Sequence, residues 1–157
     1  MKKRYFIVAL FAALILAGFL YLYLGEEPER TSVQIEVVPL NQEKIEKVVS
    51  VVDESEFISD MPSNGIISLR FYSFEGNERI WHDGFLIGKN GIVKDGVPDI
   101  YVFIHAKYID RLYERDLCEV MNEAKANEDM AIETTRNKGI LLAKYSGMLE
   151  HKECFGF

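Results

Sequence analysis

The sequence lacks the motifs that are typical of known catalytic and metal sites. It contains no G-x-S-x-G turn for a nucleophilic serine, and its three histidines and two cysteines do not form the closely spaced ligand pairs of structural zinc sites. The glycine-containing stretch 84–91 is not followed by an expected helix, so it does not resemble a phosphate-binding loop. We therefore expect no enzymatic activity, no cofactor and no metal.

One enzymatic alternative stays open. His151 and Cys154 lie three residues apart near the end of the chain, where a thiolate–imidazole pair would be a nucleophile. An extracytoplasmic enzyme of this kind requires a further polar group in the same cleft. The carboxylates Asp83, Asp95 and Asp99 cluster around expected hairpins, where turn chemistry accounts for them.

Positive charge is scarce. The chain has 18 Lys and Arg against 25 Asp and Glu, and residues 2–4 hold three of the basic ones. The remainder carries 15 basic and 25 acidic residues, a formal charge of −10. This balance disfavours nucleic acid and anionic lipid surfaces as partners of the domain as a whole, although a local basic patch is compatible with it.

The stretch from Tyr5 to Leu24 contains no charged residue, no Asn, no Gln and no Pro. A helix of that length covers about 30 Å, the thickness of a bilayer's hydrocarbon core. Basic residues 2–4 precede it, and Glu26, Glu27 and Glu29 follow it. The charge asymmetry predicts a single-pass membrane protein with a cytoplasmic N-terminus and an extracytoplasmic C-terminal domain.

A cleaved signal peptide is the competing interpretation, because it also begins with basic residues and an apolar core. The apolar run here is longer and ends in bulky residues without a small-x-small cleavage site. We therefore predict residues 1–25 as a cytoplasmic start plus transmembrane helix, 26–31 as a tether and 32–157 as one extracytoplasmic domain. Sequence alone leaves open whether Cys118 and Cys154 in that domain pair as a disulfide or remain thiols.

Hydrophobic periodicity predicts an α+β domain with an antiparallel sheet covered by helices. In the strand 79–87 we expect Trp81, Phe85 and Ile87 to share one face. The strand 99–105 is apolar on both faces, so it is expected to be central and covered on both sides. The expected strands are 32–40, 65–74, 79–87, 92–93, 99–105 and 130–135; the expected helices are 41–52, 106–115, 116–128 and 139–150.

The order of elements resembles the lipid-binding sterol-carrier-protein family over about residues 65–149. The resemblance lies in a very apolar strand led by Pro98-Asp99, a short helix bearing Tyr108-Ile109-Asp110-Arg111-Leu112, and a later strand, turn and helix over 132–149. It implies an α+β sandwich with an apolar cavity between sheet and helices, and a lipid or other hydrophobic ligand.

We therefore predict a membrane-anchored, non-enzymatic domain that binds a lipid-like ligand at the outer membrane surface. The alternative is an interaction subunit that docks onto a larger membrane complex. Aromatic residues are the candidates for lining an apolar pocket. They are Phe71, Trp81, Phe85, Tyr101, Phe103, Tyr108 and Tyr145.

Overall fold

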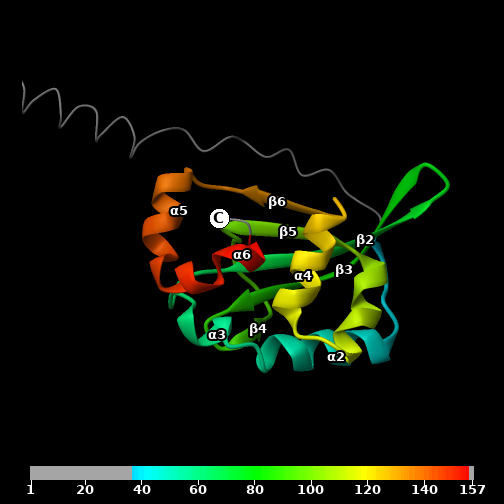
Figure 1. Cartoon of the computed structure of the whole chain (residues 1–157), viewed down its shortest axis with the longest axis horizontal. Coiled ribbons are helices and arrows are strands. Elements are labelled where there is room, and N and C mark those ends of the chain that lie inside the picture. The colour runs from blue at the N-terminus through cyan, green and yellow to red at the C-terminus, as the bar shows by residue number, and fades with distance from the viewer. Residues whose placement is uncertain (1–36, 156–157) are drawn as a thin grey trace, which may run out of the picture. The chain divides into compact units, whose positions relative to one another are not determined.

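Six strands pair into one mixed sheet in the computed structural model, which describes residues 37–155 (Figure 1). The sheet order is β1-β3-β2-β5-β6, and β4 pairs with β3. The strands are β1 (Val37–Val38), β2 (Ile67–Glu75), β3 (Glu78–Gly88), β4 (Gly91–Val93), β5 (Ile100–His105) and β6 (Met130–Thr134). The helices are α2 (Gln42–Asp53), α3 (Phe57–Asp60), η1 (Ala106–Tyr113), α4 (Leu117–Ala126), α5 (Lys138–Lys144), η2 (Ser146–His151) and α6 (Lys152–Phe155).

The sheet is mixed, so the expectation of an antiparallel sheet is wrong in part. β2 and β3 form an antiparallel hairpin, but β2 and β5 run parallel, as do β1 and β3. The parallel pairing arises because the chain returns after β4 to the end of the sheet where β2 begins. There the N–H of Asp99 donates to the carbonyl of Ile66, 2.9 Å away, and both strands leave in the same direction.

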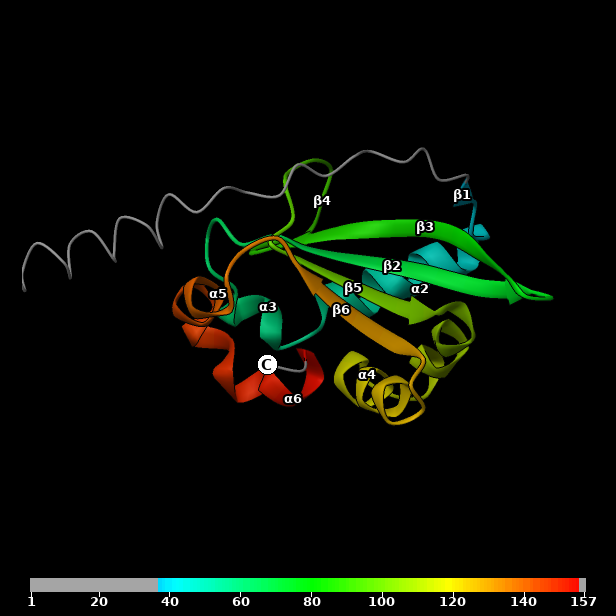
Figure 2. The same cartoon turned by 90° about the horizontal axis from the view of Figure 1, so that it is seen from above.

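Helices α3, α4, α5 and α6 lie together on one side of the sheet, the lower side in Figure 2. The core lies between this helical layer and the sheet. β5 is central, as expected, and its residues alternate between buried and half-buried. Ile100, Val102 and Ile104 point into the core, each at most 2% exposed, whereas Tyr101, Phe103 and His105 remain half-buried on the other side. Within residues 37–155, cover is therefore complete on only one of the two faces.

Side-chain caps fix where the helices begin. Asn41 accepts from the backbone N–H of Lys44 at the start of α2, and Asp116 accepts from that of Glu119 at the start of α4, both at 2.9 Å. Val48 and Val52 then lie one helical turn apart on the buried side of α2. These two helix starts were correctly predicted.

A β-bulge in the β2–β3 pair overturns one sequence-based expectation. Arg70 pairs with Gly84, but Tyr72 pairs with Trp81, so β3 contains one extra residue at this point. One extra residue reverses the alternation of side chains along the strand. Phe85 and Ile87 therefore pack toward the core, while Trp81 lies on the opposite face beside Tyr72 and Phe103.

The closing helix expected over 139–150 is divided. α5 ends at Lys144, and residues 146–151 continue as the 3-10 helix η2. Gly147 lies in this second segment, where a Cβ atom would be only 3.0 Å from the backbone carbonyl oxygen of Asp60. The absence of a side chain at this position therefore lets the chain pack closely against the end of α3.

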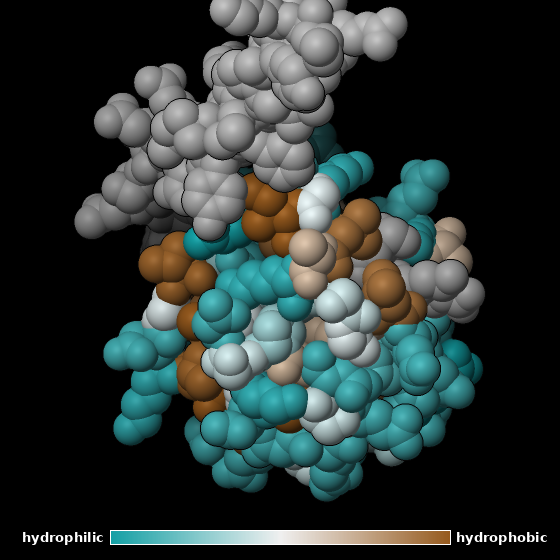
Figure 3. All heavy atoms as spheres, turned by 90° about the vertical axis from the view of Figure 1, so that its left-hand side faces the viewer, coloured by the Kyte–Doolittle hydropathy of each residue, from teal (hydrophilic) through white to brown (hydrophobic). Residues whose placement is uncertain are grey.

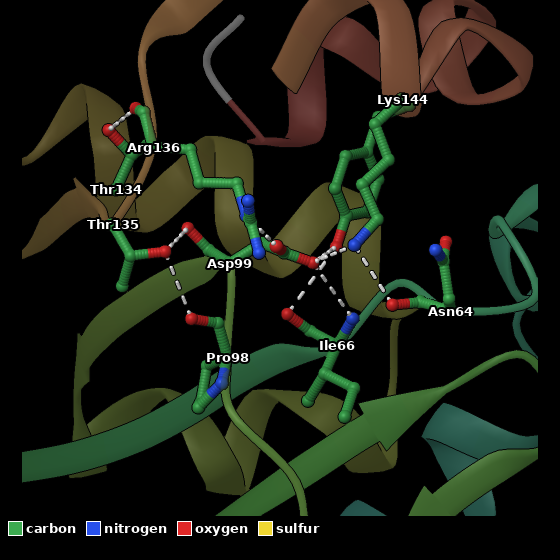
Figure 4. A network of polar contacts seen from close by, with 9 residues as sticks. Asn64, Ile66, Pro98, Asp99, Thr134, Thr135, Arg136 and Lys144 are labelled. Carbon is green, nitrogen blue, oxygen red and sulfur yellow. Dashed lines mark hydrogen bonds and ion pairs between the residues drawn. The ribbon is translucent and has the colours of Figure 1, made fainter. Parts of the chain in front are cut away.

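A buried carboxylate joins the ends of four elements (Figure 4). Asp99 is 4% exposed and lies directly before β5. Its Oδ2 accepts from Lys144 Nζ at 2.6 Å and from the Tyr145 hydroxyl at 2.9 Å, and its Oδ1 accepts from Arg136 Nε at 2.9 Å. The Thr135 hydroxyl donates to the carbonyls of Pro98 and Asp99. The starts of β2 and β5, the end of β6 and helix α5 are thus held at one point.

The charge of Asp99 is stabilised by these contacts. Burial by itself raises the pKa of the Asp99 carboxyl, but hydrogen bonds from Lys144, Tyr145 and Arg136 outweigh burial and hold the pKa below its ordinary value. Burial and the neighbouring Asp99 carboxylate together raise the pKa of the Tyr145 hydroxyl. Asp99 is therefore ionised, and Tyr145 neutral, throughout the physiological pH range.

The predicted anchor, tether and domain boundaries at 25 and 31 lie outside the described residues, as does the first part of the strand expected over 32–40. Between residues 37 and 155, no helix combines the length and apolar character needed to cross a membrane.

We expect Asp99→Asn to lower the free energy of unfolding by about 3 kcal/mol at pH 7, because Lys144 and Arg136 lose their buried anionic partner. A depressed pKa stabilises the fold above the ordinary carboxyl value of 3.8 and ceases to do so as the pH falls through the folded value. The difference from wild type should therefore shrink in acid. Urea unfolding of residues 31–157 at several pH values measures it. Glu133→Gln, on the exposed side of β6, should change stability by less than about 0.5 kcal/mol.

Candidate functional site

A surface groove of about 650 Å³ lies between α2, the start of α3, the η1–α4 connection and the C-terminal helices. Its volume lies in the range of small-molecule sites. Its lining residues are Lys47, Val51, Glu54, Ser55, Glu56, Phe57, Leu112, Tyr113, Glu114, Arg115, Asp116, Cys118, His151 and Cys154.

The floor of the groove is apolar. Phe57 and Leu112 are nearly fully buried, and Val51 packs against the same core from α2. The ring of Phe57 is held edge-on by Phe155, with ring centroids 5.0 Å apart, and by His151 at 6.4 Å. These ring contacts fix the position of Phe57 at the bottom of the groove.

Cys118 of α4 and Cys154 of α6 complete the floor as a disulfide. Their Cα atoms are 4.9 Å apart, a separation that disulfide geometry allows. Since Cys154 is bonded to Cys118, it is not the thiolate that the enzymatic alternative requires, and His151 instead donates to Asp60, 2.9 Å away. That hydrogen bond lowers the pKa of the Asp60 carboxyl. Among residues 37–155, no three His, Cys, Asp or Glu side chains converge as metal ligands.

The rim of the groove is charged, with an excess of acid. Two of its cationic groups are occupied: the ammonium of Lys47 lies 5.2 Å from the centre of the Tyr113 ring, and Arg115 forms an ion pair with Glu123 at 2.8 Å. The carboxylates that line the groove are Glu54, Glu56, Glu114 and Asp116. An apolar molecule with a neutral or cationic head group matches this floor and rim.

The structure divides the seven aromatic pocket candidates into two groups. Phe71, Tyr108 and Tyr145 are buried in the core, each 2% exposed, and Phe85 packs against that core. Tyr108 is fixed by Asp129 and Asn127, and Tyr145 by Asp99. None of the seven lines the 650 Å³ groove.

Trp81, Tyr101 and Phe103 lie on the side of the sheet away from α4 and α5. There they join Tyr72, Phe74 and His105 in a continuous series of ring contacts, with centroids 5.3–6.2 Å apart. We call these six residues the aromatic face. A hollow of about 290 Å³ beside Trp81 and Arg70 indents the surface next to it.

Sequence reasoning missed the groove residues because it considered aromatic side chains of the expected sheet and of the helices over it, whereas most of the groove residues are not aromatic. Val51, Phe57 and Leu112 come from three helices that become neighbours only in the folded chain. The pair Cys118 and Cys154 was the available signal, because a disulfide between them brings α4 and α6 together and both cysteines line the groove.

No protein-family model matches the sequence. A comparison with curated proteins also gives no match. Among solved structures, the chain is similar to the solution structure of the sterol carrier protein domain 2 of Helicoverpa armigera, with 17% identity, 76% of this chain and 96% of that chain covered, and a TM-score of 0.43. It is also similar to a UbiJ-SCP2 ubiquinone synthesis protein, with 12% identity, coverage of 69% and 91%, and a TM-score of 0.33.

The resemblance to sterol carrier protein domains that the order of elements predicted is therefore found among solved structures. It concerns the α+β arrangement of sheet and helices. The description of the groove and of the aromatic face rests on the contacts of this chain alone.

Reduction of Cys118–Cys154 should destabilise the domain by up to about 4 kcal/mol, because the bridge closes a loop spanning 36 residues in the unfolded chain. Urea unfolding of residues 31–157 with and without reductant measures the difference. The double variant Cys118→Ala/Cys154→Ala should unfold at the same urea concentration in both conditions. Alkylation of both thiols before any reductant is added would contradict the pairing.

Proposed function

We propose that this domain binds a small hydrophobic or amphipathic ligand in the groove between α2, η1, α4 and α6, without catalysing a reaction. The observation that carries the proposal is an apolar floor, made by Phe57, Leu112 and the disulfide, inside a hollow of about 650 Å³. A hydrophobic ligand gains free energy in proportion to the apolar area it removes from water, and the charged rim orients its head group.

The charge of the rim selects among ligands. Four carboxylates line the groove, and Lys47 and Arg115 already have partners. A carboxylate head group placed there would be repelled, whereas an ammonium or neutral head group would not. We therefore propose that an apolar chain or ring system with a cationic or neutral head is preferred over a fatty acid.

We propose further that residues 5–24 anchor the protein in the membrane and place the domain outside. The support is the uncharged 20-residue run, the basic residues before it and the acidic residues after it. The disulfide agrees with an oxidising compartment, where such bridges form and persist. A ligand that partitions into membranes would be available to a domain held in this way.

Native mass spectrometry of residues 31–157, prepared without detergent, tests ligand binding. We expect an adduct after incubation with lipid extract, and tighter binding of dodecylamine than of dodecanoic acid. Val51→Trp should fill the groove and weaken dodecylamine binding roughly tenfold, or about 1.4 kcal/mol. Val49→Trp is the matched control, because Val49 is also half-buried on α2 but does not line the groove. An unliganded mass under every condition would overturn the proposal.

Changing Lys2, Lys3 and Arg4 to Glu tests the orientation. Because basic residues are retained on the cytoplasmic side, we expect the triple variant to insert in mixed or inverted orientation and to lose part of its accessibility to protease added outside. The wild-type chain should be fully accessible in the same assay. Unchanged accessibility of the variant would contradict the charge-based argument.

The alternative function, docking onto a larger membrane complex, remains a prediction from the sequence. The surface that it would use is the aromatic face, and the experiment on that surface, described below, shows whether a protein partner covers it.

A further inference from the structure

The aromatic face is a continuous series of ring contacts on the side of the sheet that no described helix covers. Its rings run from Phe74 through Tyr72 to Trp81 and on to Phe103 and Tyr101, which stack with their planes 8° apart. Phe74 is 51% exposed, Trp81, Tyr101 and Phe103 are half-buried, and Tyr72 is only 6% exposed beneath them. By contrast, at the α5 end of the molecule, apolar side chains form separate groups among hydrophilic ones (Figure 3).

Charged groups of both signs accompany these rings. The guanidinium of Arg79 lies 4.7 Å from the centre of the Tyr72 ring and 5.5 Å from that of Trp81, and Arg70 lies 5.4 Å from that of Tyr101. Glu133 is next to Tyr101 in the β5–β6 register, on the exposed side of β6. Amphipathic rings with adjacent cations and anions match the head-group region of a zwitterionic bilayer, where tryptophan and tyrosine are enriched.

The position at which the described chain begins adds a geometric constraint. Val37 of β1 pairs with Trp81, so this part of the chain lies at the edge of the aromatic face. Twelve residues, 25–36, separate Val37 from the end of the uncharged run at Leu24. Fully extended, they span no more than about 40 Å. If residues 5–24 cross the membrane, the edge of the aromatic face lies within that distance of the bilayer.

We infer that the aromatic face is the surface with which this domain contacts the bilayer, its rings lying among zwitterionic phosphocholine head groups. The inference rests on the anchoring part of the proposed function and is independent of ligand binding in the groove. In this orientation the sheet lies on the membrane and the helical layer faces away from it. The exposed side of β5, which no described helix covers, is covered by lipid.

Trp81 is the sole tryptophan of the chain, so its fluorescence reports on the aromatic face alone. The full-length protein is reconstituted into phosphatidylcholine vesicles whose acyl chains carry bromine close to the head group, and into matched vesicles without bromine. We expect the brominated lipid to reduce Trp81 emission roughly twofold, since the ring sits at the interface. Equal emission in the two kinds of vesicle would overturn the inference.

Matched variants show whether the whole face is involved. Phe74→Asp places a charge on the aromatic face and should restore most of the quenched emission. Leu142→Asp alters a residue of similar exposure, 46%, on α5 in the helical layer and should leave the quenching unchanged. In the variant Trp81→Phe/Val49→Trp, the fluorophore moves to α2 and should not be quenched by brominated lipid.

The other outcomes are distinguishable. Trp81 that is insensitive to bromine and also shielded from acrylamide would indicate that a second copy or a protein partner covers the face, and would overturn the inference. Failure of the protein to float with the vesicles would overturn the anchoring proposal and this inference with it. Loss of dodecylamine binding by residues 31–157 would leave the result at the aromatic face unaffected.

Discussion

The ionised carboxylate of Asp99 determines how the strand ends are arranged at one end of the sheet. It is nearly fully buried, and its oxygens accept from Arg136, Lys144 and Tyr145. Removing a charge from water is unfavourable unless such partners compensate for it. Burial of Asp99 is therefore coupled to the placement of Arg136, Lys144 and Tyr145 around it. These contacts hold the starts of β2 and β5 side by side, so that the two strands run parallel. They also hold α5 beside the same end of the sheet.

Most helices and strands were predicted from the sequence, because helix caps and hydrophobic periodicity depend on residues close together in the chain. Asn41 and Asp116 begin helices by accepting from their own first turn, and the alternation of β5 follows directly from its sequence. Three features were wrong or missed because they depend on distant residues. The parallel pairing depends on where Asp99 meets Ile66, and the extra residue in β3 is visible only against β2. The last helix divides where the chain packs against Asp60 at Gly147. The groove was missed for the same reason, since its floor comes from three helices and a disulfide.

The bulge between Arg70 and Tyr72 separates two kinds of aromatic surface. Without it, Trp81 and Phe85 would share the core face, and the other side of the sheet would hold fewer rings. With it, Phe85 and Phe71 pack edge to face inside, at 6.3 Å, while Trp81 bridges Tyr72 and Phe103 outside. One inserted residue therefore lets β3 contribute rings both to the core and to the aromatic face on the other side of the sheet.

The short strand β1 has a mechanical consequence. It joins the sheet through two residue pairs with β3, and the backbone N–H of Leu40 adds one hydrogen bond to Asp83 at 2.8 Å. A pulling force applied through the residues before Val37 reaches the domain at this strand first. Because β1 runs parallel to β3 at the edge of the sheet, it can detach while α2 and the core stay folded. Detachment of β1 would lengthen the connection before α2 and lower the tension on the rest of the domain, which would stay folded.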